Sequence, residues 1–305
     1  MITVQRAPAY ATVQDLGRKH FRSSGVPYAG AMDSIAMATI NLLIGNARDS
    51  AGIEMALTGG AFTFDEATTF ALGGARCSAA LGTKQLESYR AFRASAGETL
   101  QVENISAGRF LYIAFGGGID TERVLGSRST YVPGAFGGLN GSRLKAGDVL
   151  PIGSSRNDRA HQVADSLPVA LRPTIGNPEI RFIPRPGEPA DEIAGRYTLS
   201  ASSDRTGYRL GGFARAGGGS VTSEPVCMGT LQLPPGGEPI ILMADAPTVG
   251  GYRVMGGVIS ADLGVLAQKL PGDSVELVRV TLERARSELE NLAEIETQIE
   301  EWCIK

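Results

Sequence analysis

Short segments in which apolar and polar residues alternate recur along the chain and predict β-strands. Residues 1–5 have the composition of a first strand, and alternation is clear at 62–64, 99–102, 110–115, 240–243 and 275–280. The 40 glycines and 16 prolines are scattered without a fixed period, which is typical of tight turns between short strands. We therefore predict a mainly β protein built from sandwiches or barrels.

Two segments have helical spacing instead. A helix over residues 34–44 follows Asp33 as its N-cap and stops at Gly45. A longer helix follows Thr281 as its N-cap, with apolar residues three or four positions apart and glutamates between them. We expect this C-terminal helix to pack on its own domain, and docking on another chain is the alternative.

The length of 305 residues favours two domains. Residues 153–178 combine a polar run with three prolines and show little periodicity, which indicates a linker. We predict an N-terminal domain over residues 1–160, a linker over 161–178, a C-terminal domain over 179–280 and a terminal helix over 281–305.

The composition excludes several classes of protein. No apolar run reaches the roughly 18 residues that a membrane-spanning helix needs, and the N-terminus lacks the zones of a signal peptide, so we expect a cytoplasmic protein. The net charge of −3 argues against binding to nucleic acid. Three distant cysteines and two isolated histidines argue against a disulfide framework and a metal site.

Several common catalytic motifs are absent from the sequence. No lysine follows a glycine, which excludes the G-x-x-x-x-G-K-[ST] phosphate-binding loop, and no serine lies in G-x-S-x-G. No methionine precedes a lysine, so the Met-Lys dipeptide typical of covalent biotin attachment is missing. Chemistry that uses ATP or biotin therefore needs other subunits or an unfamiliar pocket.

Charged residues beside glycines mark candidate sites in both halves. In the C-terminal half these are Asp204, Arg205 and Arg209, and Arg205 and Arg209 share a face whether the segment is a helix or a strand. In the N-terminal half, the guanidinium of Arg128, flanked by hydroxyls and backbone amides, could bind carboxylate or phosphate, unless Arg128 is a structural ion-pair partner. Asp33 could do no more than cap a helix, and Asp15 could simply pair with Arg18 across a turn.

The order of these motifs resembles one protein family. Its marks are Asp15-Leu16-Gly17-Arg18, Gly25-Val26-Pro27, Gly30-Ala31-Met32-Asp33, Gly126-Ser127-Arg128-Ser129-Thr130, Ser203-Asp204-Arg205 and Gly250-Gly251-Tyr252, together with residues 41–46, 116–119, 207–210, 261–263 and 268–273. The whole chain is similar to the family known as the 5-oxoprolinase C subunit (PxpC), KipA, allophanate hydrolase subunit 2, or carboxyltransferase domain subdomains A and B.

This resemblance implies two cyclophilin-like β-barrel domains with a few helices and a C-terminal α-helix. It also implies a sister subunit of the KipI type, which is the B subunit of 5-oxoprolinase, and a LamB/YcsF-type A subunit in the complex that opens 5-oxoproline to glutamate with ATP. ATP would act through the complex, with neither biotin attached to this chain nor a metal. Two alternatives stay open: carboxyl transfer from carboxybiotin to urea or a related amide, and non-catalytic regulation through a KipI-type partner.

Under the first hypothesis, the expected site draws on both halves of the chain. The candidate catalytic residues are Asp33, Asp204, Arg205 and Asp245. The candidate substrate-binding residues are Arg128, Ser129, Arg209, Gln232, Thr248 and Tyr252. The arginines would hold anionic groups, one of the aspartates would orient or deprotonate a reactant, and Thr248 and Tyr252 would line the pocket.

Overall fold

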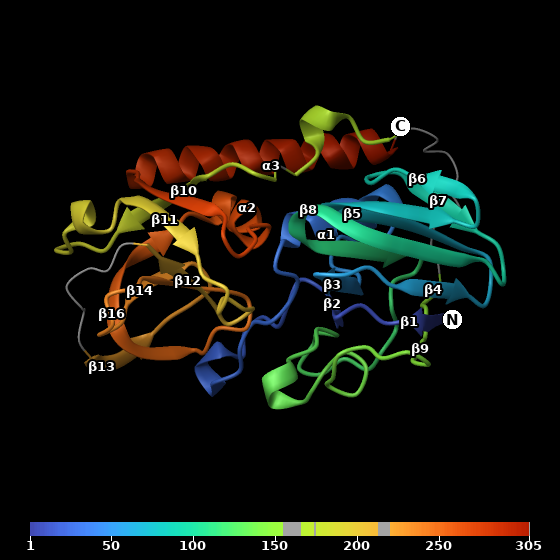
Figure 1. Cartoon of the computed structure of the whole chain (residues 1–305), viewed down its shortest axis with the longest axis horizontal. Coiled ribbons are helices and arrows are strands. Elements are labelled where there is room, and N and C mark those ends of the chain that lie inside the picture. The colour runs from blue at the N-terminus through green and yellow to red at the C-terminus, as the bar shows by residue number, and fades with distance from the viewer. Residues whose placement is uncertain (155–165, 174, 213–219, 305) are drawn as a thin grey trace. The chain divides into compact units, whose positions relative to one another are not determined.

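The computed structural model describes residues 1–154, 166–173, 175–212 and 220–304. The chain forms two compact units (Figure 1). The N-terminal unit comprises residues 1–18, 29–175 and the chain from Ile295 onward, and the C-terminal unit comprises residues 19–28 and 176–294. The predicted linker lies partly outside the described residues, at 161–165 and 174. The domain limits at 160, 178 and 280 stay predictions.

The N-terminal unit is built on one curled antiparallel sheet that forms a half-barrel. Its strands are β1 (Ile2–Arg6), β2 (Tyr10–Gln14), β3 (Gly52–Ala56), β4 (Ala61–Phe64), β5 (Thr68–Leu81), β6 (Lys84–Leu86), β7 (Ala91–Ala94), β8 (Thr99–Phe115) and β9 (Val149–Leu150). The order is β2-β3-β8-β4-β1-β9, with β5 pairing with β6, β7 and β8. Strand β8 joins the two segments predicted at 99–102 and 110–115 into one long strand.

The long β5–β8 ribbon bends at register shifts between Gly74 and Ala79. Gly74 has a φ of 92°, and a Cβ there would lie 2.4 Å from the carbonyl oxygen of Phe110, so only glycine fits. The bend lets the sheet curl around a core in which Phe62, Phe64 and Phe115 are fully buried. Closing the sheet over these rings supplies the apolar burial that stabilises the unit.

The C-terminal unit contains a closed barrel. Its strands are β10 (Glu179–Pro184), β11 (Gly195–Leu199), β12 (Gly207–Gly211), β13 (Ser220–Pro225), β14 (Thr230–Leu233), β15 (Ile240–Leu242), β16 (Val249–Val258) and β17 (Ser274–Arg279). The order is β10-β17-β11-β12-β15-β14-β16, closed by pairing of β10 with β16, and β13 extends the sheet from β16. The half-barrel and this barrel confirm the predicted mainly β fold.

Three α-helices and several 3-10 turns complete the described chain. They are α1 (Ser34–Leu43), α2 (Leu263–Ala267) and α3 (Leu282–Ile304), with η1 (Arg22–Ser24), η2 (Val132–Gly134), η4 (Val169–Leu171), η5 (Ala190–Glu192) and η6 (Ser260–Asp262). The N-cap predicted for α1 is confirmed, because the Asp33 side chain accepts a hydrogen bond of 3.0 Å from Ala36 N. Helix α1 is largely buried against β5 and β8.

The C-terminal helix α3 begins where the sequence predicts, since Thr281 Oγ1 accepts a hydrogen bond of 3.2 Å from Arg284 N. Within the C-terminal unit its Glu288 forms an ion pair of 2.9 Å with Arg181 on β10. Within the N-terminal unit its Ile299 is buried and its Glu296 forms an ion pair of 2.9 Å with Arg48. The helix therefore packs within the chain.

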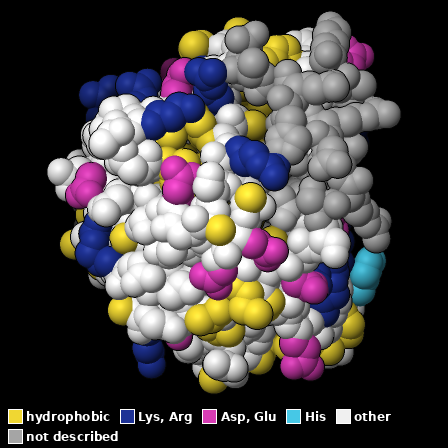
Figure 2. All heavy atoms as spheres, turned by 90° about the vertical axis from the view of Figure 1, so that its right-hand side faces the viewer, with side chains coloured by type: hydrophobic (Ala, Val, Ile, Leu, Met, Phe, Trp, Pro, Cys, Tyr) yellow, Lys and Arg dark blue, Asp and Glu magenta, His cyan; other side chains and the backbone are white. Residues whose placement is uncertain are grey.

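The surface carries charges of both signs. Figure 2 shows the side on which β4, β6 and β7 lie in Figure 1, where Lys and Arg side chains alternate with Asp and Glu and with small groups of hydrophobic side chains. Such mixing produces no strong field of one sign on this face. Among the residues described, no helix has both the length and the apolar character required to span a membrane.

Candidate active site

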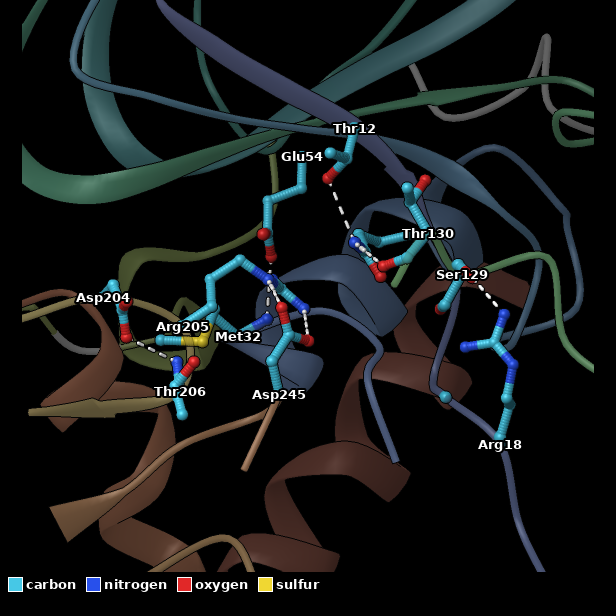
Figure 3. Close-up of polar contacts among 12 residues, drawn as sticks. Thr12, Arg18, Met32, Glu54, Ser129, Thr130, Asp204, Arg205, Thr206 and Asp245 are labelled. Atoms are coloured by element: carbon cyan, nitrogen blue, oxygen red, sulfur yellow. Dashed lines mark hydrogen bonds and ion pairs between the residues drawn. The ribbon is translucent and has the colours of Figure 1, made fainter. Parts of the chain in front are cut away.

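Arg205 and Asp245 form a buried ion pair in the C-terminal unit. Strands β12 and β15 are antiparallel with Gly207 opposite Leu242, so the residues before β12 and after β15 are neighbours. Arg205 Nε donates to Asp245 Oδ2 and Nη2 donates to Oδ1, both at 2.9 Å. The side chains are only 7% and 5% exposed. This two-point geometry fixes the plane of the guanidinium (Figure 3).

The loop that carries Arg205 is held by its neighbour Asp204. Asp204 Oδ1 accepts hydrogen bonds from Thr206 N at 2.8 Å and Gly207 N at 3.2 Å, and the carboxylate is exposed (Figure 3). The backbone amide of Asp245 donates to Arg205 O at 2.8 Å. Asp204 therefore shapes the turn, while Asp245 contacts the arginine through both backbone and side chain.

Arg209 and Gln232 lie in one row across three strands of the barrel. Arg209 on β12 is opposite Ile240 on β15, which is opposite Gln232 on β14. Opposite residues point to the same face, and two strand spacings place the two Cα atoms roughly 10 Å apart. Arg209 is exposed, whereas Gln232 is buried and its Nε2 has no hydrogen-bond partner among the described residues.

The two remaining candidates of the C-terminal unit are Thr248, directly before β16, and Tyr252, within β16. Thr248 is half-buried, and its carbonyl oxygen accepts a hydrogen bond of 3.1 Å from Val226 N. Tyr252 is 41% exposed. Between them, Gly250 leaves room for Gln232, since a Cβ on Gly250 would lie 2.5 Å from Gln232 Nε2. Gln232 and this stretch of β16 are therefore in close contact.

In the N-terminal unit, Asp33 lies next to a fully buried carboxylate, Glu54. Glu54 on β3 is directly opposite Tyr112 on β8, whose hydroxyl donates to Glu54 Oε2 at 3.0 Å. The same carboxylate oxygen accepts from Met32 N at 2.7 Å (Figure 3), and the Tyr112 hydroxyl accepts from Asp33 N at 2.8 Å. These contacts fix the backbone just before α1.

Burial, and after it the negative charges of Glu54 and Asp33, raise the pKa of Tyr112 well above its usual range. The Tyr112 hydroxyl therefore stays protonated and remains a hydrogen-bond donor to Glu54. A carboxyl group that is 0% exposed requires such hydrogen-bond donors, because a buried polar group without a partner is costly.

A second buried carboxylate, Asp15, holds the segment 127–129 in place. Asp15 Oδ1 accepts from Ser127 Oγ at 2.7 Å and from Ser129 Oγ at 2.6 Å, and Oδ2 accepts from Arg128 N at 2.7 Å. Oδ1 also accepts from Gly17 N at 2.8 Å. The predicted substrate-binding residue Ser129 is fully buried and its hydroxyl faces Asp15. The hydroxyl therefore forms a structural hydrogen bond and does not face a substrate.

The guanidinium of Arg18 binds the same segment. It donates to the carbonyl oxygen of Ser129 (Figure 3). It also donates to the carbonyl oxygen of Val124 and stacks 4.7 Å from the centre of the Phe136 ring. Asp15 and Arg18 therefore both bind residues of the segment 124–129. These contacts are longer in range than the pairing of Asp15 with Arg18 across a turn that was considered from the sequence.

Arg128 lies in the same unit and is partly buried. Its Nε donates to Thr121 O at 2.8 Å, and its Nη2 forms an ion pair with Asp120. The ion-pair alternative considered from the sequence is therefore present, although the guanidinium keeps an exposed fraction of 18%.

The run Gly116-Gly117-Gly118 does not provide free backbone donors. Gly116 N donates to Thr69 O at 2.7 Å, Gly117 N to Asn46 Oδ1 at 2.9 Å and Gly118 N to Phe115 O at 2.8 Å. A phosphate-binding loop needs amides that point at the ligand, so this glycine run does not fit the triphosphate of ATP. Nor do the described residues contain a cluster of three His, Cys, Asp or Glu side chains suited to a metal ion.

Comparison with known proteins identifies the family. Residues 24–279 match the family described as carboxyltransferase domain, subdomains A and B. The chain belongs to this family. The family predicted from the ordered motifs is thereby confirmed.

Relatives of this carboxyltransferase-domain chain are of two kinds. It is 35% identical over 294 residues to the C subunit of 5-oxoprolinase from Escherichia coli, an alignment that covers 93% of each chain. It is 31% identical to urea amidolyase of Lachancea kluyveri over 91% of this chain but 17% of that protein. The structure of Kluyveromyces lactis urea carboxylase superposes with a TM-score of 0.86 at 28% identity, covering 96% of this chain and 29% of that one.

Within the C-terminal unit, the fold of this family member brings several predicted site residues together. Arg205 pairs with Asp245, Asp204 adjoins them, and Arg209 and Gln232 share a row of the same sheet. Asp33, Arg128 and Ser129 belong to the N-terminal unit, where Asp33 caps α1 and Arg128 and Ser129 adjoin Asp15. The functional roles of all these residues stay predictions.

Sequence reasoning missed Glu54 and Tyr112. One signal was available: Glu54 stands between Ile53 and Met55 in a strand whose residues are all buried, where a lone carboxylate is unusual. Its partner could not be found in this way, because alternation identifies strands but leaves open which residue of β8 lies opposite Glu54.

Proposed function

We propose that this chain is the C subunit of an ATP-dependent complex that opens 5-oxoproline to glutamate. The observation that carries the proposal is the 35% identity to a protein of that name, which extends over 93% of both chains. The name implies sister subunits, which we propose to be a KipI-type B subunit and a LamB/YcsF-type A subunit.

The chemistry requires activation of a poor electrophile. In the complex, ATP would transfer its γ-phosphoryl group to the lactam oxygen, with ADP as the leaving group. One water then adds to the ring carbon, and the C–N bond breaks as the nitrogen takes a proton, which gives γ-glutamyl phosphate. A second water hydrolyses this acyl phosphate to glutamate and inorganic phosphate. Since Gly116–Gly118 offer no free amides, we place the ATP site on the sister subunits or on a surface shared with them.

Arg205 is the group in this chain best suited to stabilise negative charge on the reacting oxygen. Its guanidinium is fixed by Asp245 through two hydrogen bonds of 2.9 Å, so it needs little reorganisation as charge develops. In this role Asp245 is a positioning residue, because it affects the reacting oxygen only by holding Arg205. Arg209, exposed on β12, would hold another anionic group of the reactants.

Reconstitution of the complex tests the proposal. This chain would be co-expressed with its sister subunits, and glutamate formation from 5-oxoproline would be measured by chromatography with and without ATP. ATP-dependent glutamate formation that requires this chain supports the proposal. A pure, assembled complex that forms no glutamate contradicts it, and tight assembly without turnover on any lactam or urea favours a regulatory role.

A second function, carboxyl transfer to urea or a related amide, is favoured by the structural likeness to urea carboxylase. It requires carboxybiotin on a separate carrier protein. Adding a biotin carboxylase and its biotinylated carrier, with ATP, urea and bicarbonate, tests it: carboxylated urea would appear only when this chain is present.

A further inference from the structure

A cavity of about 390 Å³ lies in the N-terminal unit beside the loop that follows β8. Its lining includes four glycines, and its charged and hydroxyl side chains are those of Asp49, Ser50, Asp120, Arg123, Arg128 and Ser154. This volume is in the range of cavities that bind small molecules. Apart from Arg128, these residues are not among the candidate site residues.

The wall of this cavity disfavours phosphate. Besides the amides of residues 116–118, Ile119 N donates to Ala51 O and Asp120 N to Pro151 O, both at 2.8 Å, and Gly153 N donates to Gly118 O at 2.9 Å. Among the described residues, the amides of 116–120 and 153 are therefore not free to surround a phosphate.

Arg128 instead offers a fixed donor suited to a carboxylate. Its Nε and Nη2 are used by Thr121 O and Asp120, and no acceptor for Nη1 is found among the residues that the structure describes. Since Arg128 lines the cavity, its guanidinium belongs to the part of the chain that a ligand bound there would contact. Arg123 lines the same cavity and is anchored through Nη1 to Gly126 O at 3.1 Å.

Asp49 provides an acceptor on the same cavity. It is exposed, and no hydrogen bond or ion pair joins it to another described residue. With Asp120 it balances the formal charges of Arg123 and Arg128, so the wall has no net charge to attract a multiply charged anion. The balance favours a ligand with one carboxylate and one hydrogen-bond donor.

We propose that this cavity binds a small monocarboxylic acid that also carries an amide N–H. Its carboxylate accepts hydrogen bonds from Arg128 and Arg123, and its N–H donates to Asp49. 5-Oxoproline has both groups, so the inference deepens the proposed function and rests on it, by assigning substrate recognition to the N-terminal unit.

Calorimetric titration of the whole chain and of the reconstituted complex, without ATP, tests this site. The probes are 5-oxoproline, cyclopentanecarboxylate, which lacks the N–H, 2-pyrrolidinone, which lacks the carboxylate, and inorganic phosphate. We expect 5-oxoproline to bind most tightly. R128K and R123Q should each weaken its binding by roughly tenfold, because the guanidinium contacts are lost. D49N should weaken the binding of 5-oxoproline relative to the binding of cyclopentanecarboxylate.

R76Q is the matched control, since Arg76 is an exposed arginine of the same unit that does not line the cavity, and it should bind like the wild type. Thermal unfolding of each variant separates lost binding from lost folding, and R123Q and D49N alter exposed residues. Wild-type affinity in R123Q, D49N and R128K, absence of binding in both chain and complex, or tighter binding of phosphate would overturn the inference. Binding without ATP-dependent turnover would overturn the proposed function alone.

Discussion

Arg205 and Asp245, 40 positions apart in the sequence, bind each other through two hydrogen bonds of 2.9 Å at the paired ends of β12 and β15. Both side chains are almost completely removed from water. A pair of this kind adds little net stability relative to apolar residues, but loss of one partner leaves an unpaired buried charge.

This asymmetry predicts that Arg205→Ala and Asp245→Ala each lower the free energy of unfolding by roughly 3–5 kcal/mol. The double substitution should lower the free energy of unfolding by clearly less than the sum of the two single losses, because it leaves no unpaired buried charge. Urea unfolding of the three variants and the wild type measures this coupling. Strictly additive losses would show that the two side chains do not interact as their geometry indicates.

Asp33 can be tested for a role beyond helix capping. Asp33→Asn keeps an oxygen for Ala36 N, whereas Asp33→Ala removes the cap and should lower stability by about 1 kcal/mol. If Asp33 acts in the reaction, Asp33→Asn lowers turnover of the reconstituted complex strongly at near-normal stability. Full turnover in Asp33→Asn would restrict Asp33 to the helix cap.

The Asp15 cluster, in which Asp15 accepts hydrogen bonds from Ser127, Arg128 and Ser129, predicts a large loss of stability from a small substitution. Ser129→Ala removes a hydrogen bond of 2.6 Å to the Asp15 carboxylate and the acceptor of Asp15 N, so we expect a loss of roughly 1.5–3 kcal/mol. Ser142→Ala, which removes one bond of 3.3 Å to Leu139 O, is the control and should cost less than about 1 kcal/mol. Equal losses in the two variants would contradict a special role for the cluster.

The three cysteines should differ in reactivity. Burial raises the pKa of Cys77 to about 11, and burial together with the charge of Glu300 raises the pKa of Cys303 to about 12. At pH 8 their thiolate fraction is therefore about a thousandth or less, and it should rise about tenfold per pH unit below these values. Cys227 is exposed.

Thiol titration with a chromogenic disulfide at pH 8 should therefore show one fast thiol in the folded protein and three after unfolding. Cys227→Ser should remove the fast phase. Three equally fast thiols in the native protein would contradict the burial of Cys77 and Cys303.

Local signals in the sequence predicted much of this fold. The Asp33 cap, the start of α3 at Thr281 and the main strands depend on neighbouring residues and follow from spacing alone. The contacts of the site depend on register instead. Arg205 and Asp245 were each identified as candidates, but their pairing requires Gly207 to lie opposite Leu242, which no local pattern determines.

The most direct test is ATP-dependent glutamate formation from 5-oxoproline by the reconstituted complex, compared between the wild type and Arg205→Lys. Lysine keeps the charge but cannot reproduce the two-point contact with Asp245. We predict turnover that requires ATP and this chain, and a loss of roughly a hundredfold or more in kcat for Arg205→Lys. Full activity of Arg205→Lys, or an assembled wild-type complex that forms no glutamate, would contradict the account.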